Sequence, residues 1–349
     1  MNGLKLLIAD SSSVYKKMFR QAAAELDENA AVTCVDFENE AFDKIKRCDY
    51  DIFVIDAEVF ESDMCKLFRI ISVEMPKALV LITARYSSVS GKLCSEAMAK
   101  GAFDYMIKPV NKSYGENFDL VKRKMSDVFN FVHEKREKES KRSEIEPLKE
   151  EKAPRQSDFR PKIVLMAVST GGPFALEKIL SKLRGNFPLP ILVVQHIAPK
   201  FTEHLARHLN KKSQLRVKVA ENGESVTAGT VYLAPGGVHM KLNAENKIQL
   251  DDSPPLNGIR PAADALFESV AESFTESGIL AVILTGMGND GKKGLAGLKK
   301  KGDCVCLAQS EETCVVYGMP CAAVESGLVD KIVDLDKISA EIESLTAQR

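Results

Sequence analysis

The sequence predicts an α/β protein built from two doubly wound parallel sheets, and three observations predict it. Short apolar runs alternate with amphipathic stretches in the first third of the chain and again in its second half. Reactive polar residues follow directly after several of these runs, where the carboxyl ends of parallel strands place binding sites. A highly charged stretch separates the two patterns. We therefore expect a five-stranded domain at residues 1–125, a charged linker at 126–160 and a larger Rossmann-like domain at 161–349.

Composition narrows the class of protein. The chain has 349 residues with a formal net charge of −1, so it has no general attraction to nucleic acid or to anionic membranes. The apolar run near the start is too short for a signal peptide, and no long uncharged apolar segment follows. Its eight cysteines include no C-x-x-C pair, which favours reduced thiols buried as small apolar groups. We expect a soluble, cytoplasmic protein with no nucleic-acid partner and no membrane insertion.

In the first domain each apolar run predicts one buried strand. The expected strands are residues 4–9, 32–35, 52–55, 78–82 and 105–107. The stretches between them have the spacing of helices, so the strands should lie parallel with helices on both faces of the sheet.

Chemically active side chains stand at the ends of four of these strands. Asp10 follows the first, Asp56 the third, Thr83 ends the fourth and Lys108 ends the fifth. Two carboxylates can bind a hard divalent cation, a hydroxyl and an ammonium can bind phosphoryl oxygens, and a carboxylate can accept a phosphoryl group. Each residue alone reads as an ordinary turn or cap residue, but all four in this order indicate a phosphoryl site.

At these residues, positions 1–125 resemble the receiver domain of response regulators. The resemblance implies that Asp56 is the phosphoacceptor, that Asp10 and Asp56 bind Mg²⁺, and that Thr83 and Lys108 hold the phosphoryl oxygens. It also implies a histidine kinase as the phosphodonor. Ser11 stands where receivers usually carry a second acid, and a neutral ligand there predicts weaker Mg²⁺ binding.

The stretch after His133 is dense in charge and nearly free of apolar residues, so it cannot bury enough surface to fold alone. Its first part is compatible with an extension of the preceding helix, because glutamate and lysine alternate at short spacing. Pro147, Pro154 and Pro161 then favour an extended tether. The alternative is a charged surface that docks onto one of the domains.

The second domain opens with a buried strand at 163–168 that stops at Ser169. Gly171 and Gly172 permit a tight turn, and apolar residues at helical spacing follow at once. Ser169 therefore lies on a strand-to-helix turn. A serine before a helix N-terminus is well placed to attack a carbonyl, because the positive end of the helix favours developing negative charge.

Two further strand ends carry residues that suit the same chemistry. His196 follows a strand at 191–194, and Asp290 follows a strand at 279–284. If the three strands share one parallel sheet, their carboxyl ends meet at one edge. Serine needs a histidine to take its proton, and the histidine needs a carboxylate to fix its tautomer. The Gly-Met287-Gly turn can supply backbone N–H groups as an oxyanion hole.

Other interpretations remain open at this stage. Separately, Ser169, His196 and Asp290 each read as turn or cap residues. His204 and His208 have the spacing of metal ligands on a helix, so a metal-dependent hydrolase is an alternative, as are a nucleotide-binding or a non-catalytic receptor-binding module. His239 beside a Gly-Gly turn is either a structural residue or a residue on the substrate side of a site.

Over residues 161–335 the chain resembles the CheB family of chemotaxis protein-glutamate methylesterases. The resemblance lies in Ser-Thr-Gly-Gly at 169–172, Gln-His at 195–196, Ala-Pro-Gly-Gly at 234–237 with His239, Leu-Thr-Gly-Met-Gly-Asn-Asp-Gly at 284–291, and the run AQSEETCVVYGMP at 308–320. Ala167 is a small departure, because the family usually has glycine there.

This resemblance implies hydrolysis of γ-glutamyl methyl esters on methyl-accepting chemotaxis receptors, often together with deamidation of receptor glutamines. It assigns Ser169 as the nucleophile, His196 as the base, Asp290 as the acid that orients it, and the Met287 N–H as an oxyanion donor. No cofactor is implied for the esterase. Phosphorylation of the receiver is expected to regulate it.

Overall fold

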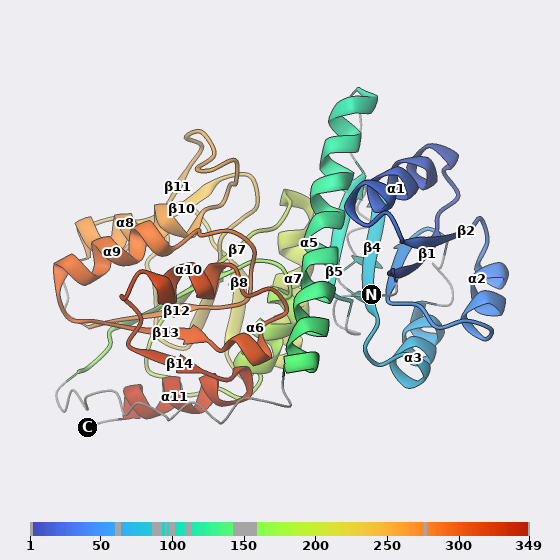
Figure 1. The fold of residues 1–349 in the computed structure, drawn as a ribbon. Helices are drawn as coiled ribbons and strands as arrows, with labels where there is room; N and C mark the ends of the chain where they lie inside the picture. Colours follow the sequence, from blue (N-terminus) through green and yellow to red (C-terminus); the bar gives the residue numbers. More distant parts are fainter. Residues whose placement is uncertain are drawn as a thin grey trace. The chain divides into compact units, whose positions relative to one another are not determined.

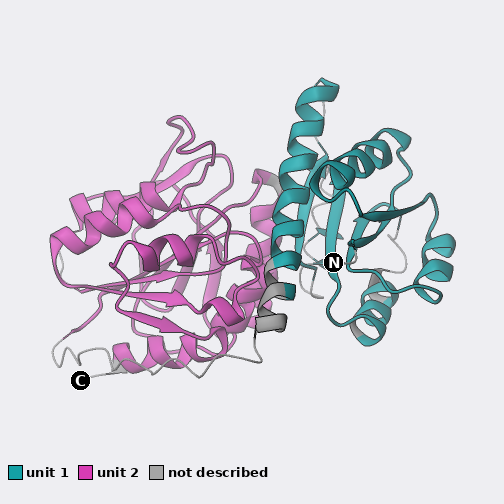
Figure 2. Cartoon of the chain, in the orientation of Figure 1, with its two compact units in different colours: residues 1–149 teal, residues 150–349 magenta. Residues whose placement is uncertain are grey.

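The computed structural model describes residues 3–59, 64–85, 93–94, 96–97, 102–108, 113–141, 159–274 and 278–347. The chain forms two compact units, residues 1–149 and 150–349 (Figure 2). Each unit is built on its own parallel sheet, as the alternating sequence pattern predicts.

The first unit is a five-stranded parallel sheet in the order β2-β1-β3-β4-β5. Figure 1 labels β1, β2, β4 and β5 of this sheet. Its strands are β1 Lys5–Ala9, β2 Ala31–Val35, β3 Ile52–Asp56, β4 Leu79–Arg85 and β5 Asp104–Lys108. Its helices are α1 Ser13–Leu26, α2 Glu38–Ile45, α3 Met64–Glu74 and α5 Tyr114–Lys141. All five expected strands are present. β4 continues past the expected end because Arg85 still pairs with Lys108 of β5.

Helix α5 extends well beyond residue 125, so the first part of the stretch expected to be a linker is helical. Its charged sequence supports this, because glutamate and lysine are good helix formers. Near its start α5 is anchored by buried Val121, Met125 and Val128, and it packs against α1. The rest of the expected linker, residues 142–158, lies outside the described residues.

The second unit is a seven-stranded sheet in the order β14-β13-β12-β6-β7-β9-β8, and its paired strands all run parallel. These strands are β6 Ile163–Val168, β7 Ile191–Gln195, β8 Arg216–Val219, β9 Thr230–Leu233, β12 Ile279–Ile283, β13 Cys304–Gln309 and β14 Lys331–Val333. A separate antiparallel hairpin joins β10 His239–Leu242 to β11 Ile248–Asp251. The helices are α6 Gly172–Leu180, α7 Pro199–Lys212, α8 Ala263–Ser273, α9 Lys292–Lys301, α10 Met319–Glu325, α11 Leu335–Ala347 and a 3₁₀ turn at Glu311–Thr313.

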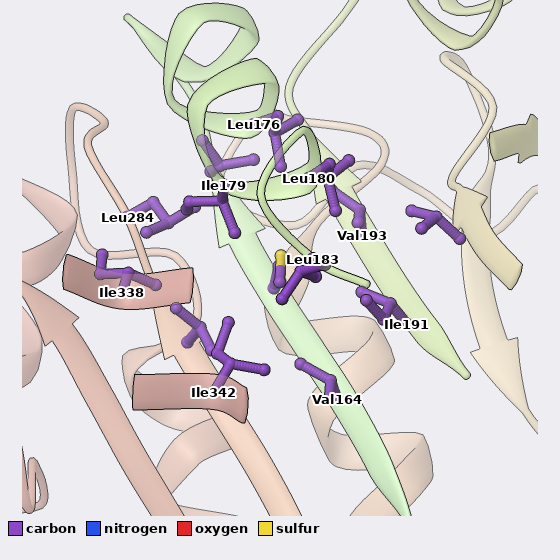
Figure 3. Close-up of a cluster of buried hydrophobic side chains, with 14 of the residues drawn as sticks. Val164, Leu176, Ile179, Leu180, Leu183, Ile191, Val193, Leu284, Ile338 and Ile342 are labelled. Carbon is purple, nitrogen blue, oxygen red and sulfur yellow. The ribbon is translucent and has the colours of Figure 1, made fainter. Parts of the chain in front are cut away.

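Strand β6 is buried on both faces, which explains its uninterrupted apolar sequence. Val164, Met166 and Val168 point to one core, which α6, α7 and α11 cover. Figure 3 shows part of this core, with Ile179 of α6 and Ile338 of α11 among its side chains. The alternate residues of β6 point to a second core under α8, α9 and α10. The period-two alternation therefore fixes β6 in the middle of the sheet.

The order of the strands reverses direction at β6. The chain moves from β6 to β7 on one side, whereas β12 lies on the other side of β6. In open α/β sheets a crevice forms outside the carboxyl ends of the strands at such a switch point. The residues that follow β6, β7 and β12 therefore share the position where this fold binds ligands.

The expectation that the cysteines are buried is correct for only part of the set. Cys94, Cys304, Cys306 and Cys314 are buried, but Cys48 is exposed. Burial raises the pKa of Cys304 to about 12, so this thiol is unreactive. No helix among the described residues is both long and apolar enough to cross a bilayer.

Candidate active site

Ser169 lies immediately after β6, at the start of a tight turn into α6. The Gly172 N–H donates to the Ser169 carbonyl over 2.8 Å. Gly171 has φ +77°, and a Cβ there would lie 2.4 Å from the Val315 side chain. The turn therefore needs glycine at 171 both for its backbone conformation and for space.

A single buried side chain ties the Ser169 turn to the His196 loop. The amide nitrogen of Gln195 donates to the Ser169 carbonyl (2.9 Å) and to the His196 carbonyl (3.1 Å). Gly172 makes room for it, because a Cβ there would meet Gln195 Oε1 at 2.0 Å. The His196 N–H continues the sheet by donating to the Val168 carbonyl. The backbones that carry the hydroxyl and the imidazole are thus fixed side by side.

The imidazole of His196 and the carboxylate of Asp290 are in direct contact, with 2.6 Å between Nε2 and Oδ2. Asp290 is buried, and it also accepts N–H groups from Ala263 (2.6 Å), Asp264 (2.9 Å) and Gly291 (3.0 Å). Burial alone would raise the pKa of Asp290, but these hydrogen bonds outweigh it, so the pKa is below its ordinary value. An ionised Asp290 fixes the proton on Nε2 and leaves His196 Nδ1 as the acceptor.

Ser169 and His196 are adjacent through their backbones, but their side chains form no hydrogen bond with each other within the ranges described. Contacts of this kind often tighten only when a substrate binds. The structure therefore brings His196 and Asp290 into direct contact, and it holds Ser169 beside them at the switch point.

The glycine-rich turn after β12 lies against the Ser169 turn. The Ser169 N–H donates to the Thr285 carbonyl over 3.0 Å, and a Cβ at Gly286 would lie 2.7 Å from Ser169 Cβ. The Gly286 N–H donates to the Val316 carbonyl, so it is not available as an oxyanion donor. Among the described residues, no backbone bond uses the Met287 N–H. Within the predicted turn at 286–288, the Met287 N–H therefore remains available as an oxyanion donor.

Thr285 links this turn to the segment at 314–318. Its hydroxyl oxygen accepts the N–H groups of Val315 (3.1 Å) and Val316 (2.9 Å), and its hydroxyl proton donates to the Thr170 carbonyl (2.9 Å). Thr285 is buried, and its own N–H donates to Gln309. One hydroxyl therefore fixes the Ser169 turn and the loop beside it in one arrangement.

The other histidines have defined partners. His239 is fully buried, and it accepts the Ala262 N–H at Nδ1 and contacts the Pro254 carbonyl through Nε2. These contacts favour the structural interpretation of His239. His208 contacts Glu177 over 2.7 Å, and Arg207 contacts Nδ1 of His204. The metal-dependent and nucleotide-binding alternatives gain no support from the described residues, which contain no cluster of three or more His, Cys, Asp or Glu placed to hold a metal.

The first unit has its own cluster of buried charge at the carboxyl edge of its sheet. Lys108 Nζ lies 2.6 Å from Asp10 Oδ2 and 2.5 Å from Asp56 Oδ2, and all three side chains are buried. The ring of Tyr15 faces the same ammonium, 5.1 Å from its centroid. Burial raises the pKa of Asp10, although the charge of Lys108 opposes this shift. The strand-end acids and the lysine thus converge as the sequence pattern predicts.

Two polar atoms in this cluster lack hydrogen bonds. Within the described ranges, the fully buried Thr83 hydroxyl has no hydrogen-bonding partner, and Asp10 Oδ2 contacts Lys108 as an ion pair without the direction of a hydrogen bond. Thr83 is the register partner of Asp56 in the neighbouring strand. Ser11 is exposed at the rim. Buried polar atoms without partners are costly, so these indicate a place that a polar group completes.

Sequence reasoning gave no role to Asp264, Thr285 or Gln195. Asp264 reads as an ordinary acid in a first helical turn, and Thr285 as one residue of a glycine-rich motif. Only Gln195 had a signal, because a polar residue closing a fully apolar strand needs a buried partner.

The fold and these two sites define a class of protein. A parallel α/β sheet with a serine turn, an imidazole and an ionised carboxylate at its switch point is the arrangement that serine hydrolases use. The family model described as CheB methylesterase matches residues 164–342. The chain belongs to the CheB methylesterase family.

Relatives and a solved structure agree with this assignment. A protein of Syntrophomonas wolfei named protein-glutamate methylesterase/protein-glutamine glutaminase 1 is 37% identical, covering 98% of this chain and 99% of that protein. A Desulfotalea psychrophila protein of the corresponding name is 35% identical, covering 98% of each. The crystal structure of the Thermotoga maritima CheB methylesterase catalytic domain is 45% identical, with a TM-score of 0.51, over 53% of this chain and 98% of that one.

Proposed function

We propose that the chain hydrolyses γ-glutamyl methyl esters on methyl-accepting chemotaxis receptors, with Ser169 as nucleophile, His196 as general base and Asp290 as the residue that orients it. The observation that carries the proposal is the 2.6 Å contact between His196 and Asp290 beside the Ser169 turn. The names of the full-length relatives support the substrate class. The proposed setting is the cytoplasm.

The chemistry follows from the free atoms of the site. His196 Nδ1 takes the proton of the Ser169 hydroxyl while Oγ attacks the ester carbonyl, and Asp290 stabilises the resulting imidazolium. The Met287 N–H donates to the oxyanion, a contribution typically worth about 3 kcal/mol. The imidazolium then protonates the departing methoxide, which releases methanol. Water, activated by His196, hydrolyses the acyl-enzyme and restores Ser169.

The same steps deamidate a glutamine when ammonia replaces methanol as the leaving group. The second half of the relatives' names, protein-glutamine glutaminase, supports this activity for the chain. Amides are harder to break than esters because their leaving group needs a proton at the moment of departure. We therefore expect the methyl ester to be the faster substrate.

Control by the first unit is the other part of the proposal. Asp56 accepts a phosphoryl group from a histidine kinase, and Thr83 and Lys108 bind the phosphoryl oxygens. Asp10 and Asp56 would hold Mg²⁺. The unpartnered Thr83 hydroxyl and the paired carboxylates fit a divalent cation and a phosphoryl group. Bound Mg²⁺ would neutralise the charge of the transferring phosphoryl group. Phosphorylation then shifts the population between states of different esterase activity.

Methanol release from methylated receptor membranes tests the esterase proposal. Ser169→Ala should lower the rate by about a thousandfold or more, whereas Ser181→Ala, at the far end of α6, should not. A chelator should leave turnover of the wild type unchanged. Retained turnover in Ser169→Ala would overturn the proposal. Adding a small phosphodonor with Mg²⁺ to wild type and to Asp56→Asn tests the control, because only the wild type should change its rate.

A further inference from the structure

Asp264 and Asp290 exchange helix caps. The Asp290 carboxylate accepts N–H groups at the start of α8, and the Asp264 carboxylate accepts N–H groups at the start of α9. Asp290 precedes α9, but its carboxylate accepts the N–H groups of Ala263 and Asp264 at the start of α8. Asp264 lies in the first turn of α8, but its Oδ1 accepts the N–H groups of Gly291 (3.0 Å) and Gly294 (2.7 Å) at the start of α9. The Gly291 N–H also donates to Asp290 Oδ1. The two carboxylates are therefore joined through the first turns of both helices.

The packing of α8 on α9 is close enough to make this exchange rigid. A Cβ at Gly294 would meet Phe267 Cβ at 2.4 Å, so the two helices touch where the caps cross. Gly291 has φ +90°, and it leads from Asp290 directly into α9. Both carboxyl groups are buried. A change in the acceptor at 264 must therefore be transmitted to the backbone that carries Asp290.

We propose that Asp264 is a positioning residue for Asp290: it fixes the start of α9, and thereby holds the Asp290 carboxylate at the angle that the imidazole of His196 requires. This inference rests on the proposed function, in which His196 is the base. Asp264 touches neither the imidazole nor any reacting atom. Its effect on catalysis passes through the orientation of Asp290.

The charges around Asp264 define its behaviour with pH. It faces Asp290 across the crossed caps, Glu268 on its own helix, and Lys293 of α9, which pairs with Glu268 over 2.8 Å. His239 lies close by, bonded to the Ala262 N–H just before α8. Burial raises the pKa of Asp264 to about 6, and the charge of Asp290 adds to this rise. The pair thus holds one ionised carboxylate beside one that titrates near neutrality.

Asp264→Asn and Asp264→Ala separate the two parts of the role in the full-length protein. Asparagine keeps the oxygen that accepts the Gly291 and Gly294 N–H groups and removes the charge, whereas alanine removes both. Glu272→Gln is the matched control, because it changes an exposed acid near the far end of the same helix. The readouts are kcat and KM for methanol release, and the pKa of His196 from NMR of the ring protons, with His196→Gln to assign the signal.

We expect Asp264→Ala to lower kcat about tenfold or more with KM within about twofold, and to lower the pKa of His196 by about one unit. Asp264→Asn, which keeps the acceptor oxygen, should restore kcat to within about threefold of wild type. Unchanged kcat and His196 pKa in a folded Asp264→Ala would overturn the proposal. If that variant does not fold, Asp264→Glu takes its place, because it keeps the charge and moves the oxygen that accepts the Gly291 and Gly294 N–H groups; an unchanged kcat in Asp264→Glu would overturn the proposal.

The His196 titration needs no substrate, so it distinguishes this inference from the proposed function. If Ser169→Ala kept its turnover, the proposed function would fail. A shift of the His196 pKa in Asp264→Ala would still support the positioning role.

Discussion

Both sheets carry buried acids at their carboxyl edges, but the two sets of acids differ in how completely their hydrogen-bonding capacity is satisfied. In the second unit the Asp290 carboxylate accepts hydrogen bonds from the His196 imidazole and from three backbone N–H groups, so directed hydrogen bonds stabilise its charge. In the first unit Asp10 and Asp56 share one lysine, and the Thr83 hydroxyl beside them has no hydrogen-bonding partner in the part of the chain that the structure describes. A fully satisfied carboxylate is held in one geometry, whereas an incompletely satisfied cluster has a strong preference for a further charged ligand.

This difference separates preorganisation from switching. Catalysis gains when dipoles are fixed before the reaction, because no reorganisation is needed in the transition state. A switch needs two arrangements of similar free energy that a ligand can tell apart. The satisfied edge suits a site that must not move, and the unsatisfied edge suits a site that changes when a phosphoryl group and a cation arrive.

The largest effect should come from replacing the fully hydrogen-bonded carboxylate of Asp290. Asp290→Asn presents an amide to His196 Nε2 and disfavours the tautomer that leaves Nδ1 free. We expect kcat for methanol release to fall about 10⁴-fold. Asp252→Asn, which changes an exposed acid, should leave kcat unchanged. A loss smaller than about tenfold would mean that Asp290 does not orient the base.

Removing the shared cation should break the other edge by a different mechanism. Lys108→Ala leaves two buried carboxylates without a counter-charge, so the free energy of unfolding of the first unit should fall by about 3–5 kcal/mol. Lys122→Ala, which loses only an exposed pair with Glu25, should cost less than about 1 kcal/mol. Denaturant titration measures both. Equal losses of unfolding free energy in the two variants would show that the buried carboxylates do not depend on the charge of Lys108.

A pH titration of stability sharpens the comparison at Asp264. The folded pKa of about 6 lies above the ordinary 3.8, so the folded state binds the proton more tightly than the unfolded state. The stabilisation is present below about pH 4 and is lost as the pH rises to about 6. Relative to Asp264→Asn, the wild type should lose about 2–3 kcal/mol across this window. A difference that is flat with pH, or that grows in the opposite direction, contradicts the assignment.

The smallest effect is expected at the rim of the first edge. Ser11→Asp supplies a second carboxylate next to Asp10, so Mg²⁺ should bind about tenfold more tightly. The Mg²⁺ concentration for half-maximal phosphorylation of Asp56 by acetyl phosphate measures this. Ser13→Asp adds the same charge at the first residue of α1 and serves as the control. If both variants behave alike, general charge rather than ligation controls the cation.

The sequence predicted the position of a site residue correctly where that residue directly follows a buried strand. The apolar runs predict β1 to β7 and β12 closely enough to place Ser169, His196 and Asp290 at one edge, because a parallel sheet brings its carboxyl ends together. It did not predict the exchange of helix caps between Asp264 and Asp290, because an acid in a first helical turn normally stabilises its own helix. That Asp264 serves α9 depends on the packing of two helices, which no local pattern encodes.

The oxyanion turn illustrates the same limit at closer range. The glycines around Met287 predict free N–H groups, but the Gly286 N–H is used by Val316 from a segment that follows β13. The length of α5 was only partly predictable, because a charged stretch is compatible with either a helix or a tether. In each case the missing information is a tertiary partner.

The position of β6 between β7 and β12 has a consequence for biosynthesis. β7 follows β6 closely in the chain, whereas β12 is made only after β8 to β11 and α8. Contacts between segments close in sequence form first, because they close shorter loops. A nascent chain that ends before β12 carries the serine and the histidine without the aspartate. Under the proposed function, a growing chain therefore lacks the carboxylate that orients the base until β12 and Asp290 have been synthesised.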